Sequence, residues 1–327
     1  MGELWPGRLH VVTGKGGTGK TTVAGALAIA LASAGRRTLL VEVEGRQGVA
    51  PLFGMAPLPY AERRVATAPG GGTVRALAVD PEEALLEYLD LFYKLGIAGR
   101  ALQKFGAIDF ATTVAPGLRD ILLTGKVKEA TTRTEGGRRV YDAVVLDAPP
   151  TGRIGRFLNV TAEAARLAKV GPIKTQSEGV AAVLRSPITS IHVVTLLEEM
   201  PVQETADAIG ELRSLGMPIG KVIVNATRPE LPAGPVGATE LASALREAGL
   251  PGDRTTVAAL RREVKDYRVR QSLERSLHAN LAALGQPIVD LPFLPDGVDR
   301  VGLDRLAAKL LEPASAGAPR RSRATLK

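Results

Sequence analysis

The amino-acid sequence predicts an α/β protein built on a doubly wound, mostly parallel β-sheet. Short apolar runs without polar alternation recur along the chain, which is typical of strands that are buried on both faces. Helical patterns separate most of these runs, and right-handed crossovers then place helices on both faces of one sheet. A glycine-rich segment also follows the first run directly, as expected where a strand passes into a helix. The apolar runs occupy residues 9–13, 38–43, 74–79, 141–146, 191–197, 221–225 and 287–291.

Apolar spacing indicates three helices between these strands. Residues 23–34 are rich in alanine and leucine, and residues 206–215 and 239–248 repeat apolar side chains every three or four positions, as an amphipathic helix does. At 327 residues the chain is large for one core and small for two enzymes. We therefore expect a single α/β domain with an insertion, spanning residues 1–312.

The insertion is expected over residues 80–131, where the strand pattern stops. Its apolar side chains fall at helical spacing on two segments, with Pro116 and Gly117 between the helices. These apolar faces either pack on the sheet domain or form an open groove for a client. The apolar positions are Leu85, Leu89 and Phe92 in the first segment and Leu118, Ile121 and Leu122 in the second.

The composition is that of a globular protein without disulfides. Hydrophobic residues make up 45% and charged residues 23% of the chain, and no uncharged apolar stretch is long enough to cross a bilayer. No basic segment followed by an apolar one opens the chain, so we expect no secretory signal and a cytoplasmic location. Zero cysteines exclude disulfides and thiolate metal sites. His10, His192 and His278 are far apart in sequence, and we interpret them as ordinary core or surface residues.

Half of the net charge of +8 lies in the C-terminal tail. Residues 313–327 carry four basic side chains and no acid, namely Arg320, Arg321, Arg323 and Lys327. The Pro, Ala, Ser and Gly content of this tail predicts disorder, because it buries too little apolar surface to offset the entropy of ordering it. A net positive charge by itself bears on solubility and does not indicate a binding partner, so we do not expect the core to bind nucleic acid.

A phosphate-binding loop is predicted at residues 14–21, where the sequence GKGGTGKT matches the spacing G-x-x-x-x-G-K-T between a strand and a helix. Its glycines lack a Cβ atom, so successive backbone N–H groups can curl around phosphate oxygens. The following helix adds the positive end of its dipole. The loop before that helix consists of Gly14, Lys15, Gly16, Gly17, Thr18 and Gly19.

The residues at the start of the helix decide which ligand fits the loop. Lys20 would contact the β- and γ-phosphates, the Thr21 hydroxyl would hold Mg²⁺, and Thr22 would reach an α-phosphate oxygen. The same glycines also fit the dinucleotide pattern G-x-G-x-x-G, with Glu42 or Glu44 as the ribose-binding acid after the next strand. A dinucleotide needs neither the lysine nor the hydroxyl. We therefore predict a nucleoside triphosphate with magnesium.

Asp147 is predicted as a second residue of the magnesium site. It ends the apolar run 144–146, where a buried strand delivers a carboxylate to the carboxyl edge of the sheet beside the glycine loop. This pattern alone is common, but together with the upstream loop it fits an aspartate that binds Mg²⁺ through water. The sequence then continues Ala-Pro-Pro-Thr-Gly over residues 148–152.

Segments spread over residues 8–312 resemble the superfamily of arsenite-transporting ATPases and guided-entry ATPases for tail-anchored proteins. Residues 147–152 are similar to its second switch, Asp-Thr-Ala-Pro-Thr-Gly, with Ala148 and Pro149 in place of Thr and Ala. The chain therefore resembles an anion-transporting ATPase of the actinobacterial type. Further similar segments, in the family's order, are the first switch at residues 43–47, a helix start at 204–205, the adenine-binding strand end at 223–225 and the adenine loop at 291–295.

The resemblance implies an ATP-hydrolysing dimer that uses Mg²⁺. Lys15, directly after the first glycine, would reach across a two-fold interface and act with Lys20 on the charge that develops during phosphoryl transfer. Glu44 would replace the aspartate that positions or activates the attacking water, with Glu42 as the alternative carboxylate. A glutamate is one methylene longer, and this difference would slow hydrolysis. The adenine would be bound by Asn225, Pro292, Phe293 and Leu294.

Some residues that the family uses for particular ligands and clients are missing from this chain, which limits the functions that we expect. Without cysteine, the chain lacks both the metalloid ligands of arsenite pumps and the C-x-x-C zinc clasp of eukaryotic targeting factors, so neither arsenite nor zinc is expected. Four methionines and a short stretch at residues 157–186 argue against a methionine-rich groove for membrane-protein clients. The insertion is still available to bind a hydrophobic segment or a sister subunit.

Three functions follow from these observations. The first is a MgATP-dependent dimeric switch, a homodimer or a heterodimer, that couples ATP binding and hydrolysis to a client or partner. The second is an ATP-binding, weakly hydrolysing subunit of a hetero-oligomer with an active sister ATPase. The third is a partitioning or division-positioning ATPase, which would need a membrane helix or a DNA-binding patch that the basic tail does not resemble.

Overall fold

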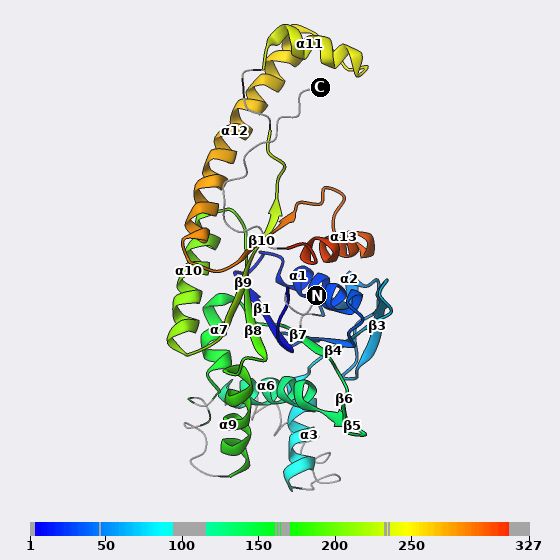
Figure 1. Cartoon of the computed structure of the whole chain (residues 1–327), viewed down its shortest axis with the longest axis vertical. Helices are drawn as coiled ribbons and strands as arrows, with labels where there is room; N and C mark the ends of the chain where they lie inside the picture. The colour runs from blue at the N-terminus through cyan, green and yellow to red at the C-terminus, as the bar shows by residue number, and fades with distance from the viewer. Residues whose placement is uncertain are drawn as a thin grey trace.

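The computed structural model describes residues 4–45, 47–93, 116–160, 162, 164, 171–231, 234 and 236–313. Eight strands form one sheet in the order β10-β9-β8-β1-β7-β2-β4-β3 (Figure 1). Neighbouring strands are parallel except for β3 and β4. The predicted mostly parallel, doubly wound sheet is confirmed. The strands are β1 (Leu9–Gly14), β2 (Thr38–Glu42), β3 (Arg63–Thr67), β4 (Thr73–Ala78), β7 (Ala143–Asp147), β8 (Thr189–Thr195), β9 (Ile219–Thr227) and β10 (Ile288–Pro292).

The centre of the sheet is buried on both faces. Every residue of β1, β2 and β7 is buried, which explains why these strands read as unbroken apolar runs. Strand β3 was not predicted from the sequence. Its residues are mostly exposed at the sheet edge, so no apolar run marks it. A separate hairpin of β5 (Thr134–Glu135) and β6 (Arg138–Arg139) was also not predicted.

Helices cover both faces of the sheet. In β2, Leu40 points into the core under α1, whereas Leu39 and Val41 point into the core on the opposite face, because successive strand residues alternate. The first face carries α1 (Lys20–Ser33), α2 (Val49–Leu52) and α13 (Arg300–Leu310). The second carries α3 (Pro81–Tyr93), α6 (Pro116–Thr132), α7 (Thr151–Leu158), α9 (Pro172–Leu184) and α10 (Glu199–Ser214).

The described part of the expected insertion consists of α3 and α6. Leu85 on α3 and Ile121 and Leu122 on α6 are buried in the core of the second sheet face, and Leu89 and Leu118 pack against it. These apolar faces therefore pack on the sheet domain. Residues 94–115, the side chain of Phe92, and residues 314–327 of the predicted tail lie outside the described residues.

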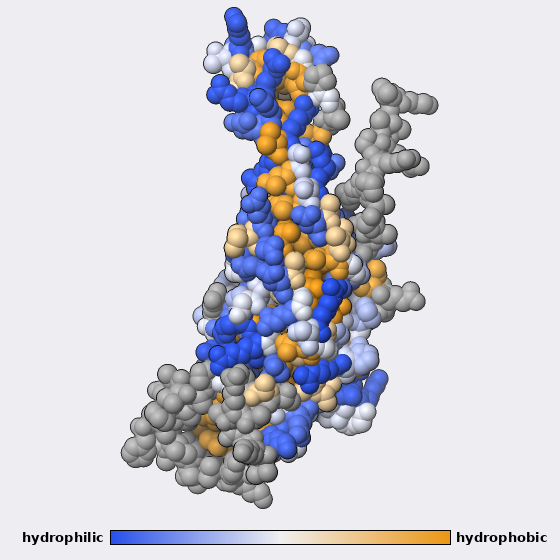
Figure 2. All heavy atoms as spheres, turned by 90° about the vertical axis from the view of Figure 1, so that its left-hand side faces the viewer, coloured by the Kyte–Doolittle hydropathy of each residue, from blue (hydrophilic) through white to orange (hydrophobic). Residues whose placement is uncertain are grey.

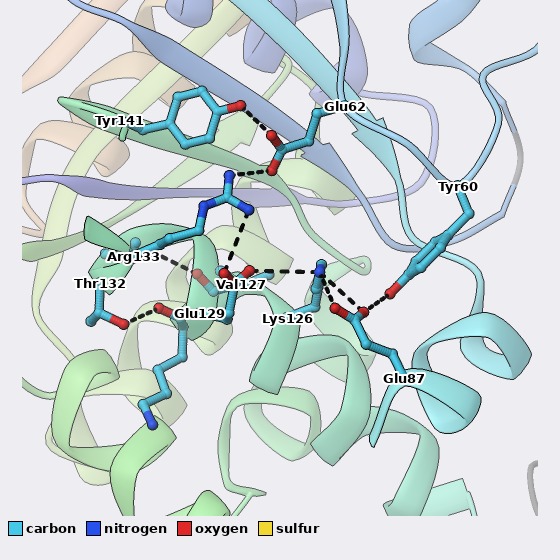
Figure 3. A network of polar contacts seen from close by, with 11 residues as sticks. Tyr60, Glu62, Glu87, Lys126, Val127, Glu129, Thr132, Arg133 and Tyr141 are labelled. Carbon is cyan, nitrogen blue, oxygen red and sulfur yellow. Dashed lines mark hydrogen bonds and ion pairs between the residues drawn. The ribbon is translucent and has the colours of Figure 1, made fainter. Parts of the chain in front are cut away.

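A polar network fastens the insertion to the edge of the sheet domain (Figure 3). Lys126 Nζ on α6 lies 2.8 Å from Glu87 Oε1 of α3, and a guanidinium nitrogen of Arg133, directly after α6, lies 2.6 Å from Oε1 of Glu62, which precedes β3. The Tyr60 hydroxyl donates to Glu87 at 2.6 Å. Helices α3 and α6 are thereby joined to each other and to the sheet, and they should move together.

Helices α11 (Ala238–Glu247) and α12 (Arg254–Ala282) follow β9 and precede β10 in the sequence, and they form an arm that projects from the body (Figure 1). The 29 residues of α12 were not predicted as a helix. Its carboxyl end packs on the body through buried Leu277 and Leu281. Apolar side chains gather along the arm (Figure 2), and Val269 and Leu273 are exposed on it. None of the described helices is long and apolar enough to span a membrane.

Two histidines are buried beside the single tryptophan of the chain. His10 on β1 and His192 on β8 stack with ring centroids 5.5 Å apart, and Trp5 contacts both rings edge-on. The Lys221 backbone N–H donates to His192 Nδ1 at 3.1 Å. The His192 proton therefore lies on Nε2, which donates to His10 Nδ1 at 3.2 Å. Burial lowers the pKa of both rings, that of His10 to about 3.

Candidate functional site

The glycine loop lies between β1 and α1, at the carboxyl end of a central strand. Gly14 has φ of 156°, and a Cβ atom there would lie 2.1 Å from the carbonyl oxygen of Val194 on β8. Gly17 and Gly19 both have φ of 87°, a left-handed conformation that favours glycine. At Gly16 a Cβ atom would meet nothing within 4 Å. Three of the four glycines are therefore required by the backbone.

Lys20 and Thr18 both reach back to the start of the loop. Thr18 Oγ1 donates to the Lys15 carbonyl oxygen at 2.9 Å, and Lys20 Nζ lies 3.5 Å from the same oxygen. Lys20 is the first residue of α1 and is buried at the positive end of the helix dipole, where an anion is favoured. Thr22 lies half-buried in the same helical turn. The arrangement suits a polyphosphate.

Thr21 and Asp147 meet at the edge of the loop. Thr21 Oγ1 donates to Asp147 Oδ2 at 2.7 Å, while the other carboxylate oxygen, Oδ1, is buried without a hydrogen-bond partner among the described residues. Burial, with smaller contributions from Glu42 and Glu44, raises the pKa of Asp147 to about 6. Hydroxyl and carboxylate oxygens are ligands that Mg²⁺ prefers. The pair therefore fits a magnesium ion, which would supply positive charge to a bound polyphosphate.

Glu42 was considered as an alternative base or as a ribose ligand, but its carboxylate is hydrogen-bonded to backbone N–H groups. Its buried carboxylate accepts from the Gly48 N–H at 2.7 Å and the Val49 N–H at 3.4 Å. These bonds hold the start of α2 close to Thr21. Glu42 therefore has a structural role at the end of β2, next to residues 43–47, the segment that resembles the first switch.

Glu44 lies in the segment that resembles the first switch, and its side chain is 17% exposed. Its charge is among the causes that raise the pKa of Asp147, so it shares the electrostatic field of the candidate magnesium site. Its Oε1 lies 3.9 Å from Arg153 Nη1 on α7. The neighbouring Arg46 lies outside the described residues.

Lys15 is held within its own chain. Its Nζ lies 2.8 Å from Glu204 Oε1 on α10, and Glu204 Oε2 accepts from the Thr151 hydroxyl at 2.9 Å. The hydrogen bond from Lys15 is the main cause of the lowered pKa of Glu204. The sequence predicted only a helix start at Glu204, and this was wrong, because α10 begins at Glu199. The partnership of Glu204 with Lys15 joins residues far apart in the chain, so no local pattern could reveal it.

The four residues predicted to bind adenine lie at the neighbouring ends of β9 and β10. The Asn225 side-chain N–H donates to the Thr18 carbonyl oxygen at 2.9 Å, so this residue also touches the glycine loop. The Phe293 backbone N–H donates to the Thr227 carbonyl oxygen at 2.8 Å, and the residue is 50% exposed. Pro292 is exposed at the end of β10, whereas Leu294 packs against the core beneath α1.

A doubly wound sheet with this glycine loop, buried lysine and threonine–aspartate pair defines a P-loop nucleoside triphosphatase. Comparison with known families specifies the class further, because the model of the anion-transporting ATPases matches residues 8–181. The chain belongs to this family, and it is an ATP hydrolase.

Three relatives illustrate the family. The ATPase BagA of Mycobacterium tuberculosis is 51% identical over 323 residues, covering 94% of this chain and 95% of that protein. The ATPase GET3 of Kluyveromyces lactis is 26% identical over 249 residues, covering 65% and 70%. The arsenical pump-driving ATPase of Acidiphilium multivorum is 26% identical over 251 residues, covering 68% and 40%. The resemblance found in the sequence is confirmed.

Proposed function

We propose that this ATPase is a dimeric switch in the cytoplasm, in which binding and hydrolysis of MgATP change the contacts between two subunits. The observation that carries the proposal is the pair formed by Lys15 and Glu204 at 2.8 Å. Both side chains are about one-third exposed, so the pair can exchange for another partner. A polyphosphate on a second subunit offers Lys15 more negative charge than one carboxylate does.

The remaining residues have separable roles in this proposal. Lys20 and the loop N–H groups bind the β- and γ-phosphates, while Thr21 and, through water, Asp147 hold Mg²⁺. Glu44 orients the attacking water, because its charge acts on Asp147 at the candidate magnesium site, whereas the carboxylate of Glu42 accepts two backbone N–H groups. Asn225, Pro292, Phe293 and Leu294 form the adenine site.

Release of Lys15 would alter the second switch. Glu204 contacts Lys15 and Thr151 with its two carboxylate oxygens, so loss of the lysine removes one of these two contacts and leaves the one with the Thr151 hydroxyl. Thr151 opens α7, which packs against α10. A change at the nucleotide thereby reaches the helices on the second sheet face, including the insertion that would meet a hydrophobic client or partner.

Turnover and oligomeric state test this proposal together. Lys20→Ala should abolish ATP binding in calorimetry, whereas Lys15→Ala should retain binding but lose both ATP-dependent dimerisation and most hydrolysis. Lys174→Ala, on the surface of α9, is a matched control that should behave as wild type. Lys15→Ala with normal turnover and a normal dimer by light scattering would refute the switch.

A second candidate is a weakly hydrolysing subunit that joins an active sister ATPase. The longer Glu44 and its ion pair with Arg153 favour it, since both place the carboxylate differently from an aspartate. Glu44→Asp should raise phosphate release if the extra methylene limits turnover. No gain with this variant, alone or with a sister subunit, would argue against this candidate.

A further inference from the structure

Arg153 contacts two carboxylates that come from different parts of the fold. It lies in the first turn of α7, directly after the second-switch residues 147–152. One guanidinium nitrogen, Nη2, donates to Asp120 Oδ1 on α6 at 3.3 Å. The other, Nη1, lies 3.9 Å from Glu44 Oε1, in the segment that resembles the first switch. We call these residues the Asp120–Arg153–Glu44 chain.

The two carboxylates at the ends of the Asp120–Arg153–Glu44 chain are buried to different extents, and this difference decides which of them fixes the arginine. The Asp120 side chain is only 6% exposed, and a buried carboxylate requires a close cationic or hydrogen-bonding partner. Glu44 is 17% exposed, and its contact with Arg153 is longer. Asp120 therefore anchors the guanidinium, and Arg153 in turn restrains Glu44. The rigid fork of an arginine reaches two carboxylates at once, which a lysine ammonium does less well.

The first turn of α7 is connected both to Lys15 of the glycine loop and to Glu44. Thr151 contacts Glu204, which pairs with Lys15, and two residues later Arg153 contacts Glu44 and Asp120. Helix α6 is in turn fastened to α3 and to the sheet edge through the network of Figure 3. A displacement of the insertion therefore acts on Asp120 first and on Glu44 next.

We propose that Arg153 is a positioning residue for hydrolysis, and that the Asp120–Arg153–Glu44 chain couples the α3–α6 insertion to the carboxylate that orients the attacking water. This inference rests on the proposed role of Glu44. A client or partner that shifts α6 changes the restraint on Glu44 and so changes turnover, without touching the nucleotide. The Asp120–Arg153–Glu44 chain should therefore affect kcat and leave the affinity for ATP unchanged.

Steady-state ATPase kinetics of the full chain test this assignment. Arg153→Gln should lower kcat about 10- to 100-fold, since misplacement of a catalytic group by about 1 Å costs that much, with KM for ATP changed less than about twofold. Asp120→Asn, which removes only the anchoring charge, should lower kcat in the same direction by a smaller factor. Arg156→Gln, one turn further along α7 and exposed, is the matched control and should leave kcat unchanged.

Epistasis separates positioning from a merely structural effect. In a Glu44→Gln background, Arg153→Gln should have no further effect on kcat, because it acts only through Glu44. An equal further loss in that background, or a raised KM with kcat intact, would overturn the inference. If Arg153→Gln fails to fold, Arg153→Lys keeps a charge near Asp120 and should show the same loss of kcat.

The controls also distinguish this inference from the proposed function. If Glu44→Gln leaves turnover unchanged, the proposed role of Glu44 is wrong, and the proposed role of Arg153 is wrong as well. If Glu44→Gln lowers turnover but Arg153→Gln does not, the role of Glu44 stands and the assignment of Arg153 is wrong.

Discussion

Replacing Asp147 with asparagine should stabilise the ligand-free protein. Burial raises the pKa of this carboxyl to about 6 from an ordinary value of 3.8. An acid whose pKa is higher in the folded state contributes stability below its unfolded pKa and loses it as the pH rises through its folded pKa. Above pH 6 the ionised Asp147 therefore costs about 3 kcal/mol. Asp147→Asn should remove up to that cost at pH 7.5 and almost none at pH 3.5.

The substitution leaves the local geometry nearly unchanged. Thr21 Oγ1 donates to Asp147 at 2.7 Å, and the amide oxygen of asparagine can accept the same bond. Magnesium and nucleotide should reverse the order of stability, because a ligand at free concentration L that binds only the folded state stabilises it by RT ln(1 + L/Kd), which is larger for the variant that binds more tightly. Wild type should gain more from MgADP than Asp147→Asn does.

Urea unfolding measures these differences with a built-in reporter. Trp5 is the only tryptophan of the chain and is 2% exposed, so its fluorescence follows loss of the core. Asp142→Asn is an informative control, because Arg37 lowers the pKa of that carboxyl and the variant should be destabilised at pH 7.5. Asp147→Asn that is less stable than wild type at pH 7.5 without ligand would refute the reasoning.

Three further outcomes are expected. Glu204→Gln should weaken the hold on Lys15 and raise ATP-dependent dimerisation several-fold in light scattering; unchanged association would contradict this. Because burial lowers the pKa of His10 and His192 below that of the unfolded chain, wild-type stability should fall as the pH drops below 6.5. His10→Leu should reduce that slope by up to about 1.4 kcal/mol per pH unit in urea unfolding, and parallel slopes would count against it. Phe293→Ala should raise the Kd for ATP in calorimetry more than that for inorganic triphosphate, whereas an equal effect on both would exclude a contact with the base.

The sequence revealed the parts of the fold that are set by local pattern. Buried central strands such as β1 and β7 have unbroken apolar runs, so their positions followed directly. Helix α12 did not, because only Val257, Gln271, Leu277 and Leu281 of its 29 residues are buried and no apolar stripe identifies it. The exposed edge strand β3 was missed for the same reason: residues that face water carry little pattern.

The candidate site divides in the same way. Gly14 to Thr22 lie within one strand–loop–helix segment, and their spacing alone indicates a phosphate site. Asp147 followed from a strand end. The partners of Lys15 and Glu44, which are Glu204 and Arg153, are brought close by the packing of α7 and α10 against the sheet, and no sequence spacing encodes those contacts.

The arm turns small movements at its base into large ones at its tip. Helix α12 leads into β10, and Phe293 directly follows that strand. A helix of 29 residues is about 44 Å long. A tilt of about 5° around its packed carboxyl end would move the far end by about 4 Å. A pair of spectroscopic labels, one near Leu250 at the tip and one on α13, would therefore report motions at the predicted adenine-binding end of the sheet as measurable changes in distance.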